Sequence, residues 1–335
     1  MKKLFILVMI AVLALVGCQS KESQTETKSN EQTEQKKLEK VTVVLDWTPN
    51  TNHTGLYVAK ENGFFEEQGL DVEIIQPGDA GADQLVASGL AEFAVSYQEN
   101  ITLARTQNVP IVSIAAVIQH NTSGFASPTD KNITSPKDFE GKTYGGWGSP
   151  IEQAVIETLM NTENADINKL DIVNAGNADF FTMANQGIDF AWIYYGWTGV
   201  EAELRGENIN MIYLTDYSEK LDYYTPVLAT NEKMIKENPD TVKAFVAASS
   251  KGYKYAIENP EDAAEILSAA APELDKELVL ESQKWLSTKY QDDVPRWGEQ
   301  KLEVWTNYAD WMKENSVLEG EFDPKKAFTN EFLPE

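Results

Sequence analysis

The sequence predicts an α/β protein of two lobes with a hinged ligand cleft between them. Short apolar runs rich in β-branched residues alternate with segments of helical periodicity, once over residues 41–118 and again over residues 143–214. Such alternation is typical of βα units around a largely parallel sheet. Residues 232–270 show helical patterns alone. Two α/β sets followed by helices therefore indicate a hinged, two-lobed receptor.

The first set predicts four strands joined by helices. Each expected strand is a short run of mainly apolar residues, and each helix is followed by glycine or asparagine, residues that favour the end of a helix. Gly89 is the expected C-terminal cap of the second helix. The expected strands are 41–45, 71–75, 93–96 and 111–118, and the expected helices are 55–61, 81–88 and 100–107.

The second set repeats this order after a short helix and turn at 136–142. Proline near the first turn marks two helices of the last third, where its fixed backbone angle suits a helix start. We expect strands at 143–145, 170–173, 190–194 and 209–214, and helices at 151–161, 180–185 and 198–205. Helices at 232–234, 241–258 and 262–270 follow, and no strand is expected after residue 228.

These elements suggest where the chain passes between lobes. It is expected to cross near residues 119–124 and to return near residues 215–228, after which the C-terminal helices cover the first lobe. The expected parts are a signal peptide (1–17), a disordered tether (18–38), a first lobe with the C-terminal helices (39–120 and 222–335) and a second lobe (121–221).

The N-terminal residues are typical of a bacterial lipoprotein signal. Lys2 and Lys3 precede an apolar stretch, and small residues lead to Cys18, the only cysteine of the chain. We expect removal of residues 1–17 and attachment of a lipid with palmitate chains to Cys18. Residues 19–37 contain no apolar residue and are expected to form a flexible tether. The expected location is the extracytoplasmic face of the cell membrane.

Composition excludes several kinds of function. The chain has 28 Lys and Arg against 53 Asp and Glu, a net charge of −25, which argues against nucleic-acid binding. One cysteine permits no internal disulfide, and two histidines make a zinc or iron site improbable. We find no catalytic motif and expect no catalytic residue, no cofactor, no metal and a monomer. Composition alone does not exclude a hydrolase with paired carboxylates.

The first candidate cluster follows the strand 41–45. Residues 46–55 are rich in hydrogen-bonding side chains at a strand end, where ligands bind in open α/β sheets. Capping of the next helix explains one such residue. The candidate ligand contacts are Trp47, Asn50, His53 and Tyr57.

The second candidate cluster is the glycine-rich turn after the strand 143–145. Gly146, Trp147 and Ser149 precede Pro150, which suits the first turn of a helix. Such a turn presents free backbone N–H groups and the positive end of a helix dipole to a ligand. The alternative is a tight turn that needs glycine only for its backbone angles.

The third candidate cluster is aromatic. Tyr195 and Trp197 follow the strand 190–194, and Glu201 lies where it can accept hydrogen bonds from an amino heterocycle. Some of these aromatic rings are expected in the core, and Glu201 has a solvated helix position as its alternative. Tyr97, Gln98 and Glu99, which follow the strand 93–96, and Asn121, at the first crossing, complete the predicted cleft.

These residues carry a family resemblance. Residues 45–59, with the Gly-Phe-Phe at 63–65 and the Gly-Leu-Asp-Val at 69–72, resemble the thiamine-pyrimidine binding and synthesis family. The resemblance implies the type II periplasmic-binding-protein fold. Its bacterial lipoprotein branch implies a receptor for formylaminopyrimidine that delivers this ligand to an ABC permease and its ATPase. It also implies that Asn50 and Tyr57 contact the ligand.

Two alternatives stay open. Receptors for a sulfonate, taurine or nitrate share this architecture, but they would need a basic clamp, and only Lys142 lies near the glycine-rich turn. The other family branch is a pyrimidine synthase that consumes a histidine at the position of His53, with pyridoxal phosphate, iron and a cysteine motif. That motif is absent, since Cys18 is the only cysteine. In the favoured interpretation, aromatic rings enclose a flat aminopyrimidine and the lobes close because the ligand contacts both.

Overall fold

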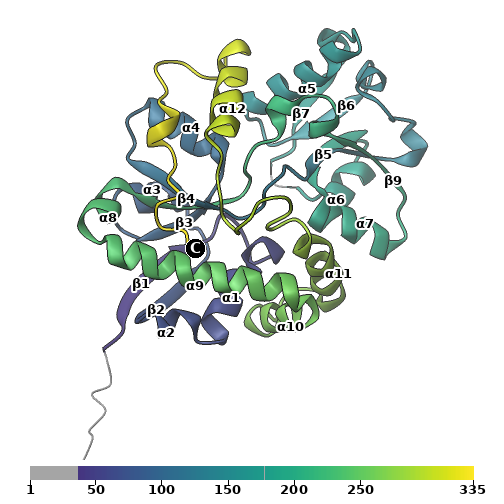
Figure 1. The fold of residues 1–335 in the computed structure, drawn as a ribbon. Helices are drawn as coiled ribbons and strands as arrows, with labels where there is room; N and C mark the ends of the chain where they lie inside the picture. The colour runs from purple at the N-terminus through teal and green to yellow at the C-terminus, as the bar shows by residue number, and fades with distance from the viewer. Residues whose placement is uncertain (1–36, 177) are drawn as a thin grey trace, which may run out of the picture. The chain divides into compact units, whose positions relative to one another are not determined.

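The computed structural model describes residues 37–176 and 178–335 (Figure 1). The predicted signal peptide, Cys18 and nearly all of the predicted tether lie outside the described residues.

Sheet A is a five-stranded mixed sheet with strand order β2-β1-β3-β10-β4. Strands β1, β2 and β3 are parallel, whereas β10 is antiparallel to both of its neighbours. Its strands are β1 (Glu39–Val44), β2 (Leu70–Ile75), β3 (Phe93–Ser96), β4 (Ile111–Ala116) and β10 (Val227–Asn231).

Sheet B repeats this arrangement with strand order β7-β6-β8-β5-β9. Strand β5 lies between β8 and β9 and is antiparallel to both. Its strands are β5 (Ser123–Pro128), β6 (Thr143–Gly146), β7 (Asp171–Asn174), β8 (Phe190–Tyr194) and β9 (Ile209–Tyr213). In each sheet, the antiparallel strand is the one that follows a passage from the other lobe.

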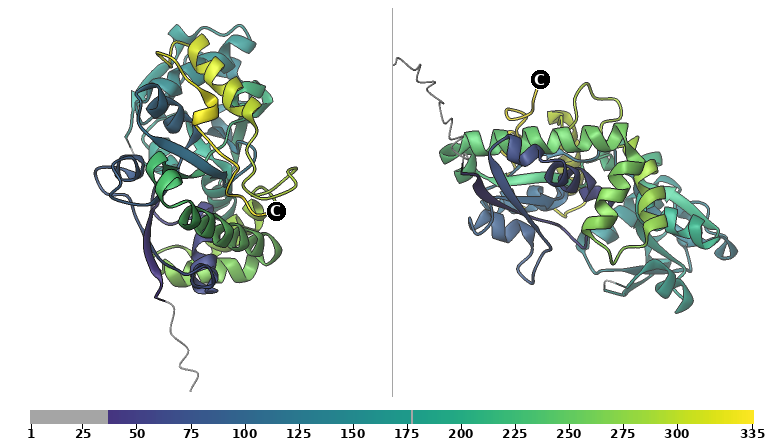
Figure 2. Two further views of the ribbon diagram at one scale, coloured as in Figure 1. Left: turned by 60° about the vertical axis from the view of Figure 1, so that its left-hand side comes forward. Right: turned by 90° about the horizontal axis from the view of Figure 1, so that it is seen from below.

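Helices flank both sheets (Figures 1 and 2). The first-lobe helices are α1 (Thr54–Glu61), α2 (Phe64–Glu67), α3 (Ala82–Ala87) and α4 (Gln98–Thr106). Those of the second lobe are α5 (Pro150–Thr162), α6 (Phe180–Asn185) and α7 (Val200–Arg205). The C-terminal helices are α8 (Glu232–Glu237), α9 (Pro239–Glu258), α10 (Pro260–Ala270), α11 (Lys276–Ser287) and α12 (Leu302–Glu314).

The sequence patterns located most elements but missed some. Strands β1–β4 and β6–β9 begin and end within two residues of their predicted bounds. The expectation of no strand after residue 228 is wrong, because β10 extends to Asn231. No strand was predicted at β5, nor a helix at α2, α11 or α12. Residues 195–199, partly assigned to a helix by the pattern, form a π-helical turn, η5 (Tyr195–Gly199).

Each sheet has its own aromatic core. In the first lobe, the rings of Phe93 and Phe245 stack with centroids 3.8 Å apart, so α9 is held against sheet A. In the second lobe, the rings of Phe139 and Phe190 stack with centroids 4.2 Å apart, and Phe125 on β5 packs against both in T-shaped contacts. Helix α12 packs on both lobes and not on the first alone: its Trp305 lies in a cluster with residues of β4 and β10, and its Trp311 lies in the second core.

The two passages between lobes are tied to each other by hydrogen bonds. The backbone N–H of Asn121, on the first passage, donates to Asp222 Oδ1, on the second, over 2.8 Å. The Asn121 amide donates to the carbonyl oxygen of Leu221 over 2.9 Å. His120 Nδ1 lies 2.6 Å from Asp222 Oδ2, and His120 Nε2 lies 3.3 Å from Asp293. This cluster positions the hinge.

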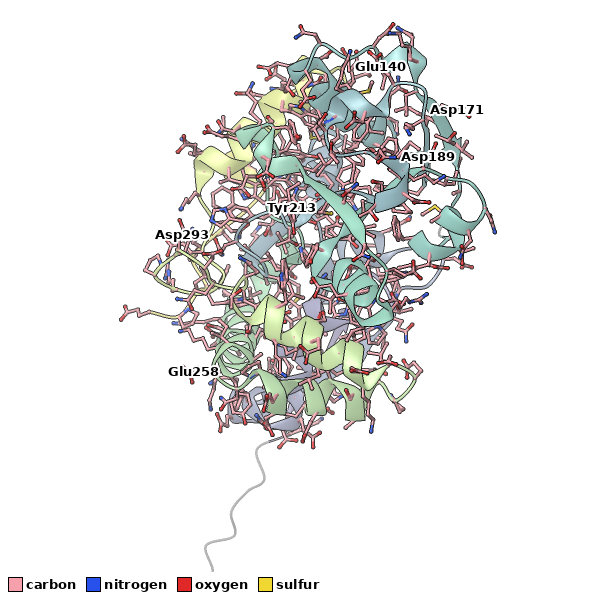
Figure 3. All side chains as sticks on the ribbon, turned by 90° about the vertical axis from the view of Figure 1, so that its right-hand side faces the viewer. Glu140, Asp171, Asp189, Tyr213, Glu258 and Asp293 are labelled. Atoms are coloured by element: carbon pink, nitrogen blue, oxygen red, sulfur yellow. The ribbon has the colours of Figure 1, made fainter. Side chains whose placement is uncertain are left out.

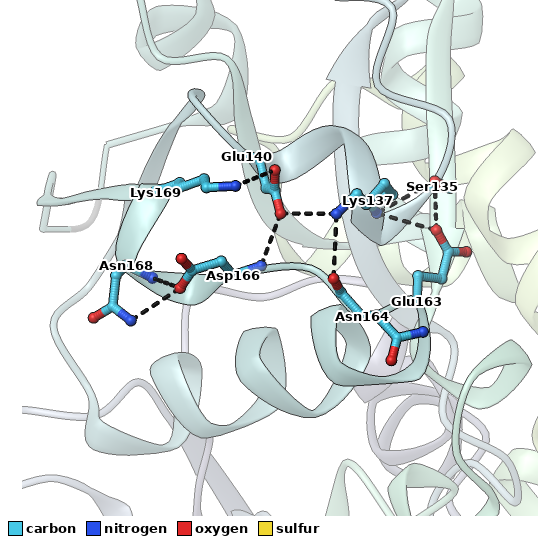
Figure 4. A network of polar contacts seen from close by, with 8 residues as sticks. All are labelled: Ser135, Lys137, Glu140, Glu163, Asn164, Asp166, Asn168 and Lys169. Atoms are coloured by element: carbon cyan, nitrogen blue, oxygen red, sulfur yellow. Dashed lines mark hydrogen bonds and ion pairs between the residues drawn. The ribbon is translucent and has the colours of Figure 1, made fainter.

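Ionic contacts are spread over the surface of both lobes. The labelled carboxylates of Glu140, Asp171 and Asp189 lie on the second lobe and that of Glu258 on α9 (Figure 3). Glu140 bonds to Lys137 and Lys169 in a network that joins two surface segments (Figure 4), and these bonds lower its pKa to about 2. No helix within the described ranges is both long and apolar enough to cross a membrane.

Candidate functional site

A cavity of about 480 Å³ lies at the carboxyl ends of β1, β3, β6 and β8. Residues of both lobes line it, as expected where two open α/β sheets face each other. The hinge residues Thr225 and Pro226 and residue Leu286 of α11 also line it. Seven of the predicted site residues are among the lining residues: Trp47, Asn50, Tyr97, Gly146, Trp147, Ser149 and Trp197.

Tryptophan side chains give the cavity its apolar surfaces. Trp47, from the first lobe, is 53% exposed, and Trp147, from the second, is 46% exposed. The ring of Trp192, which also lines the cavity, lies 5.4 Å from that of Trp147. Trp197 lines the cavity and also packs against α10 and α11. Two exposed indoles on opposite lobes suit a flat ring held between them.

Asp46 organises the first-lobe wall, although it was not among the predicted site residues. His53 Nε2 lies 2.5 Å from Asp46 Oδ1, and the Tyr97 hydroxyl donates to Asp46 Oδ2 over 2.5 Å. Burial would raise the pKa of Asp46, but the interaction with His53 and the hydrogen bonds from His53 and Tyr97 lower it overall. The carboxylate therefore fixes Tyr97 at the cavity.

His53 has both ring nitrogens engaged and is fully buried. The backbone N–H of Asn50 donates to His53 Nδ1 over 3.2 Å, so this nitrogen carries no proton. The proton is on Nε2, which donates to Asp46. His53 does not line the cavity; it supports the loop that does.

Asn50 has a structural task as well as a place in the lining. Its side-chain oxygen accepts the N–H of Asn52 over 2.9 Å, and its amide donates to the carbonyl oxygen of Thr48 over 3.0 Å. The side chain thus caps the short helix η1 (Thr51–His53).

Two N–H groups of the glycine-rich turn are not free, although the sequence predicted free N–H groups there. The backbone N–H groups of Trp147 and Ser149 donate to the carboxylate of Glu152, over 3.0 Å and 2.7 Å. Glu152 is 2% exposed and also accepts a hydrogen bond from the Tyr144 hydroxyl. A Cβ at Gly146 would lie 2.0 Å from Glu152 Oε1, so a larger residue there would displace this carboxylate. The protein's own carboxylate therefore takes up N–H donors that the sequence had assigned to a ligand.

Four further predicted residues lie outside the cavity lining. Tyr57 packs between hydrophobic clusters of the first lobe and C-terminal helices. Asn121 is the hinge residue described above. Tyr195 packs its ring 5.4 Å from Trp285 and donates its hydroxyl hydrogen to Glu203. Glu201 pairs with Arg205 on the same helix. Whether these residues act at the site stays a prediction.

Helix α11 links the two lobes beside the cavity. The hydroxyl of Ser282 donates to the carbonyl oxygen of Gly196 in the second lobe. The Thr51 hydroxyl, in the first lobe, lies 2.6 Å from that of Ser282. Since the Ser282 hydrogen is directed to Gly196, Thr51 is the donor in the second contact. Ser282 is fully buried, so this chain of hydrogen bonds is protected from water.

Three further lining residues, Glu99, Trp192 and Tyr194, lie in segments that the sequence assigned to the cleft but were not among the selected ligand contacts. Trp192 and Tyr194 occupy alternate positions on β8 and so point to the same face of the sheet. The same pattern is equally typical of aromatic residues that pack in a core. Glu99 follows β3 by three residues, so its nearness to a strand end was the available signal. Of the residues seen to line the cavity, none is Lys, Arg or His. Nor do the described ranges contain three or more His, Cys, Asp or Glu grouped to bind a metal.

Two α/β lobes joined by two passages, with a cavity at the facing strand ends, define the class: the fold is that of the periplasmic binding proteins. The aliphatic sulphonate binding protein SsuA of Escherichia coli has this fold with a TM-score of 0.69 and 12% sequence identity, over 86% of this chain and 91% of that one. The alkanesulfonate-binding protein of Xanthomonas axonopodis has a TM-score of 0.67, 10% identity and coverage of 87% and 98%.

Within this class, the chain belongs to the NMT1/THI5-like family, whose profile matches residues 50–263. It is 31% identical to the formylaminopyrimidine-binding protein of Halalkalibacterium halodurans, over 96% of each chain. It is 25% identical to a 4-amino-5-hydroxymethyl-2-methylpyrimidine phosphate synthase of Legionella pneumophila, over 88% of this chain and 93% of that one. The family thus contains both binding proteins and synthases.

Proposed function

We propose that this protein is the extracytoplasmic solute-binding lipoprotein of an ABC importer and that its ligand is a thiamine-derived aminopyrimidine, formylaminopyrimidine. The observation that carries the proposal is the cavity. It combines exposed indoles from both lobes with carboxyl groups and lacks a cationic side chain among its described lining residues. The 31% identity to a formylaminopyrimidine-binding protein over nearly the whole chain supports this ligand.

The same chemistry disfavours a sulfonate, taurine or nitrate. An oxyanion needs cationic groups or free N–H donors. Instead, Asp46 and Glu99 line the cavity, and the N–H groups of Trp147 and Ser149 are already bound to Glu152. A neutral ring with N–H donors suits these carboxyl groups better than an anion does.

The geometry of His53 favours binding over synthesis. A histidine that is consumed as a substrate must present its ring to the reacting groups. Here the ring is fully buried and both nitrogens are hydrogen-bonded, one to Asn50 and one to Asp46. In our proposal His53 serves as a fixed support for the cavity wall.

The mechanism is closure on the ligand. A ring placed between Trp47 and Trp147 contacts both lobes, and such a ligand shifts the population towards the closed form. The closed form then docks on the permease and its ATPase. The lipid at Cys18 would keep the monomeric receptor near the membrane.

Thermal unfolding with a panel of ligands tests the proposal. Formylaminopyrimidine at 100 times its Kd is expected to stabilise the fold by about 2.7 kcal/mol, which raises Tm by several degrees. Taurine and a short alkanesulfonate are expected to leave Tm unchanged. A rise in Tm with the sulfonate and none with the pyrimidine would show that the proposed ligand is wrong. Loss of mass at His53 after incubation with pyridoxal phosphate and iron would establish a synthase instead.

A further inference from the structure

One carboxyl group at the cavity has an unused hydrogen-bonding atom. Glu99 lines the cavity, and its Oε2 atom is shielded from solvent without a hydrogen-bond partner in the described part of the chain. Trp192, which is 9% exposed, lines the same cavity, and its Nε1–H is also without a partner there. Unpaired polar atoms in buried positions cost stability unless a ligand pairs with them.

Glu99 is fixed by its position in the first turn of α4. The preceding residue, Gln98, is fully buried, and its side chain accepts the N–H of Tyr224 over 2.9 Å and donates to the carbonyl oxygen of Val304 over 3.2 Å. These contacts anchor the start of α4 to the second passage between lobes. Glu99 therefore reaches the cavity from a rigid support beside the hinge.

The surroundings of Glu99 keep its carboxyl group neutral near neutral pH. Burial raises its pKa, the backbone N–H of Glu99 opposes this and the charge of Asp83 on α3 adds to it, so that the pKa is raised to about 8. The other titratable groups that interact with it are phenols, all of whose pKa values lie above their ordinary value. They are Tyr97 beside it, Tyr194 of β8, Tyr223 of the second passage and Tyr308 of α12.

We propose that Glu99 is the specificity-determining residue for the pyrimidine and binds it as a neutral carboxylic acid. The carboxyl O–H donates to a ring nitrogen, and the carbonyl oxygen accepts a hydrogen bond from the adjacent amino group. Trp192 Nε1–H donates to a further acceptor of the ligand. This inference rests on the proposed function and deepens it by naming the ligand edge that is read: a ring nitrogen beside an exocyclic amino group.

Binding through a neutral carboxyl group couples ligand affinity to the protonation of Glu99. The complex contains one proton between Glu99 and the ring nitrogen. At neutral pH the free protein already carries that proton, so binding requires no proton uptake. Above the pKa of Glu99 the proton must be taken from solvent, and affinity is expected to fall by about tenfold per pH unit.

Two substitutions of Glu99 separate its roles. Leucine has a similar volume but no polar atom, so Glu99→Leu is expected to weaken binding of formylaminopyrimidine by about tenfold or more at neutral pH. Glutamine has one donor and one acceptor, like the neutral acid, but does not titrate. Glu99→Gln is therefore expected to recover most of the affinity lost in the leucine variant and to show no alkaline decline.

The measurement is isothermal titration with formylaminopyrimidine from about pH 7 to about pH 9.5, with Tm recorded for each variant. Asp83→Asn is the matched control: Asp83 does not line the cavity, so the alkaline decline should persist, at slightly lower pH. An analogue without the ring amino group should bind the wild type weakly. Its affinity should also differ less between the wild type and Glu99→Leu than the affinity of formylaminopyrimidine does.

The outcomes distinguish the two proposals. If the wild type binds no pyrimidine at any pH, the proposed function fails and this inference with it. If the wild type binds but Glu99→Leu has wild-type affinity, Glu99 does not contact the ligand. If Glu99→Gln binds as poorly as Glu99→Leu, or if Asp83→Asn abolishes the decline, Glu99 does not act as a neutral acid.

Discussion

Replacement of Trp147 by alanine should weaken ligand binding with little effect on the fold. The Trp147 side chain is 46% exposed in a cavity wall. A tryptophan presents roughly 250 Å², so about 115 Å² is available to a ligand and the facing lobe. Burial of half to all of that area at about 25 cal/mol/Å² contributes about 1.5–3 kcal/mol. The expected loss of affinity is therefore about tenfold to one hundredfold.

Titration of formylaminopyrimidine, followed by tryptophan fluorescence or calorimetry, measures this loss. Contact with Trp192 is the main packing interaction removed from the folded protein, so the free energy of unfolding should fall by only about 1 kcal/mol. Trp147→Phe should retain part of the affinity. Leu302→Ala is the control, because Leu302 is 41% exposed and lies outside the cavity lining. A wild-type Kd for Trp147→Ala would refute the placement of the ligand against this wall.

Three other substitutions test the surroundings of the cavity. Asn50→Ala should lower the free energy of unfolding by about 1 kcal/mol, because it removes a helix cap; unchanged chemical denaturation would contradict this role. Ser282→Ala should weaken ligand affinity several-fold, by roughly 1 kcal/mol, and speed dissociation in stopped flow, because the bond to Gly196 is lost; equal rates would argue against it. The hydrogen bond to Asp222 raises the pKa of His120 to about 9, although partial burial opposes this. Because the folded pKa exceeds the unfolded one, the stabilisation is complete below about pH 6.5 and is lost as pH rises through about 9. The Tm difference between wild type and His120→Gln should follow this curve and stay small, since the ring is 43% exposed.

The sequence located the parallel strands because each is marked in its own residues. Strand β3 has an apolar run, Phe93–Ser96, that ends where a helix begins, and both bounds were predicted correctly. The same rule located the site loops, because ligands bind at the carboxyl ends of such strands. Trp47 and Trp147 were found in this way, and both line the cavity.

Strands β5 and β10 could not be found by that rule. Strand β5 contains Ser123, Gly124 and Ser127, which are weak strand formers, yet it is buried in the middle of sheet B. Gly124 is needed because a Cβ there would lie 2.2 Å from the carbonyl oxygen of Ile212 on β9. The requirement comes from a neighbour some 90 residues away, so no local pattern records it.

The site shows the same limit. The glycine-rich turn predicted free N–H groups, but Glu152 of the following helix accepts those of Trp147 and Ser149. Three aromatic or amide candidates, Tyr57, Asn121 and Tyr195, lie outside the cavity lining, although they resemble those inside it in type and position. The direction in which a side chain points at a strand end depends on the residues that pack beside it. The local sequence does not specify those residues.

By itself, the sequence determined the α/β class, the two sets of βα units, the strand ends that carry the cavity and the resemblance to the family. These features follow from local periodicity and turn chemistry, which act over a few residues. Only the tertiary structure decided which strands follow a passage between lobes, which N–H groups and rings stay available to a ligand, and that Glu99, a lining residue, has a buried oxygen without a partner in the described part of the chain. Those outcomes depend on burial and hydrogen-bond competition between segments far apart in the chain.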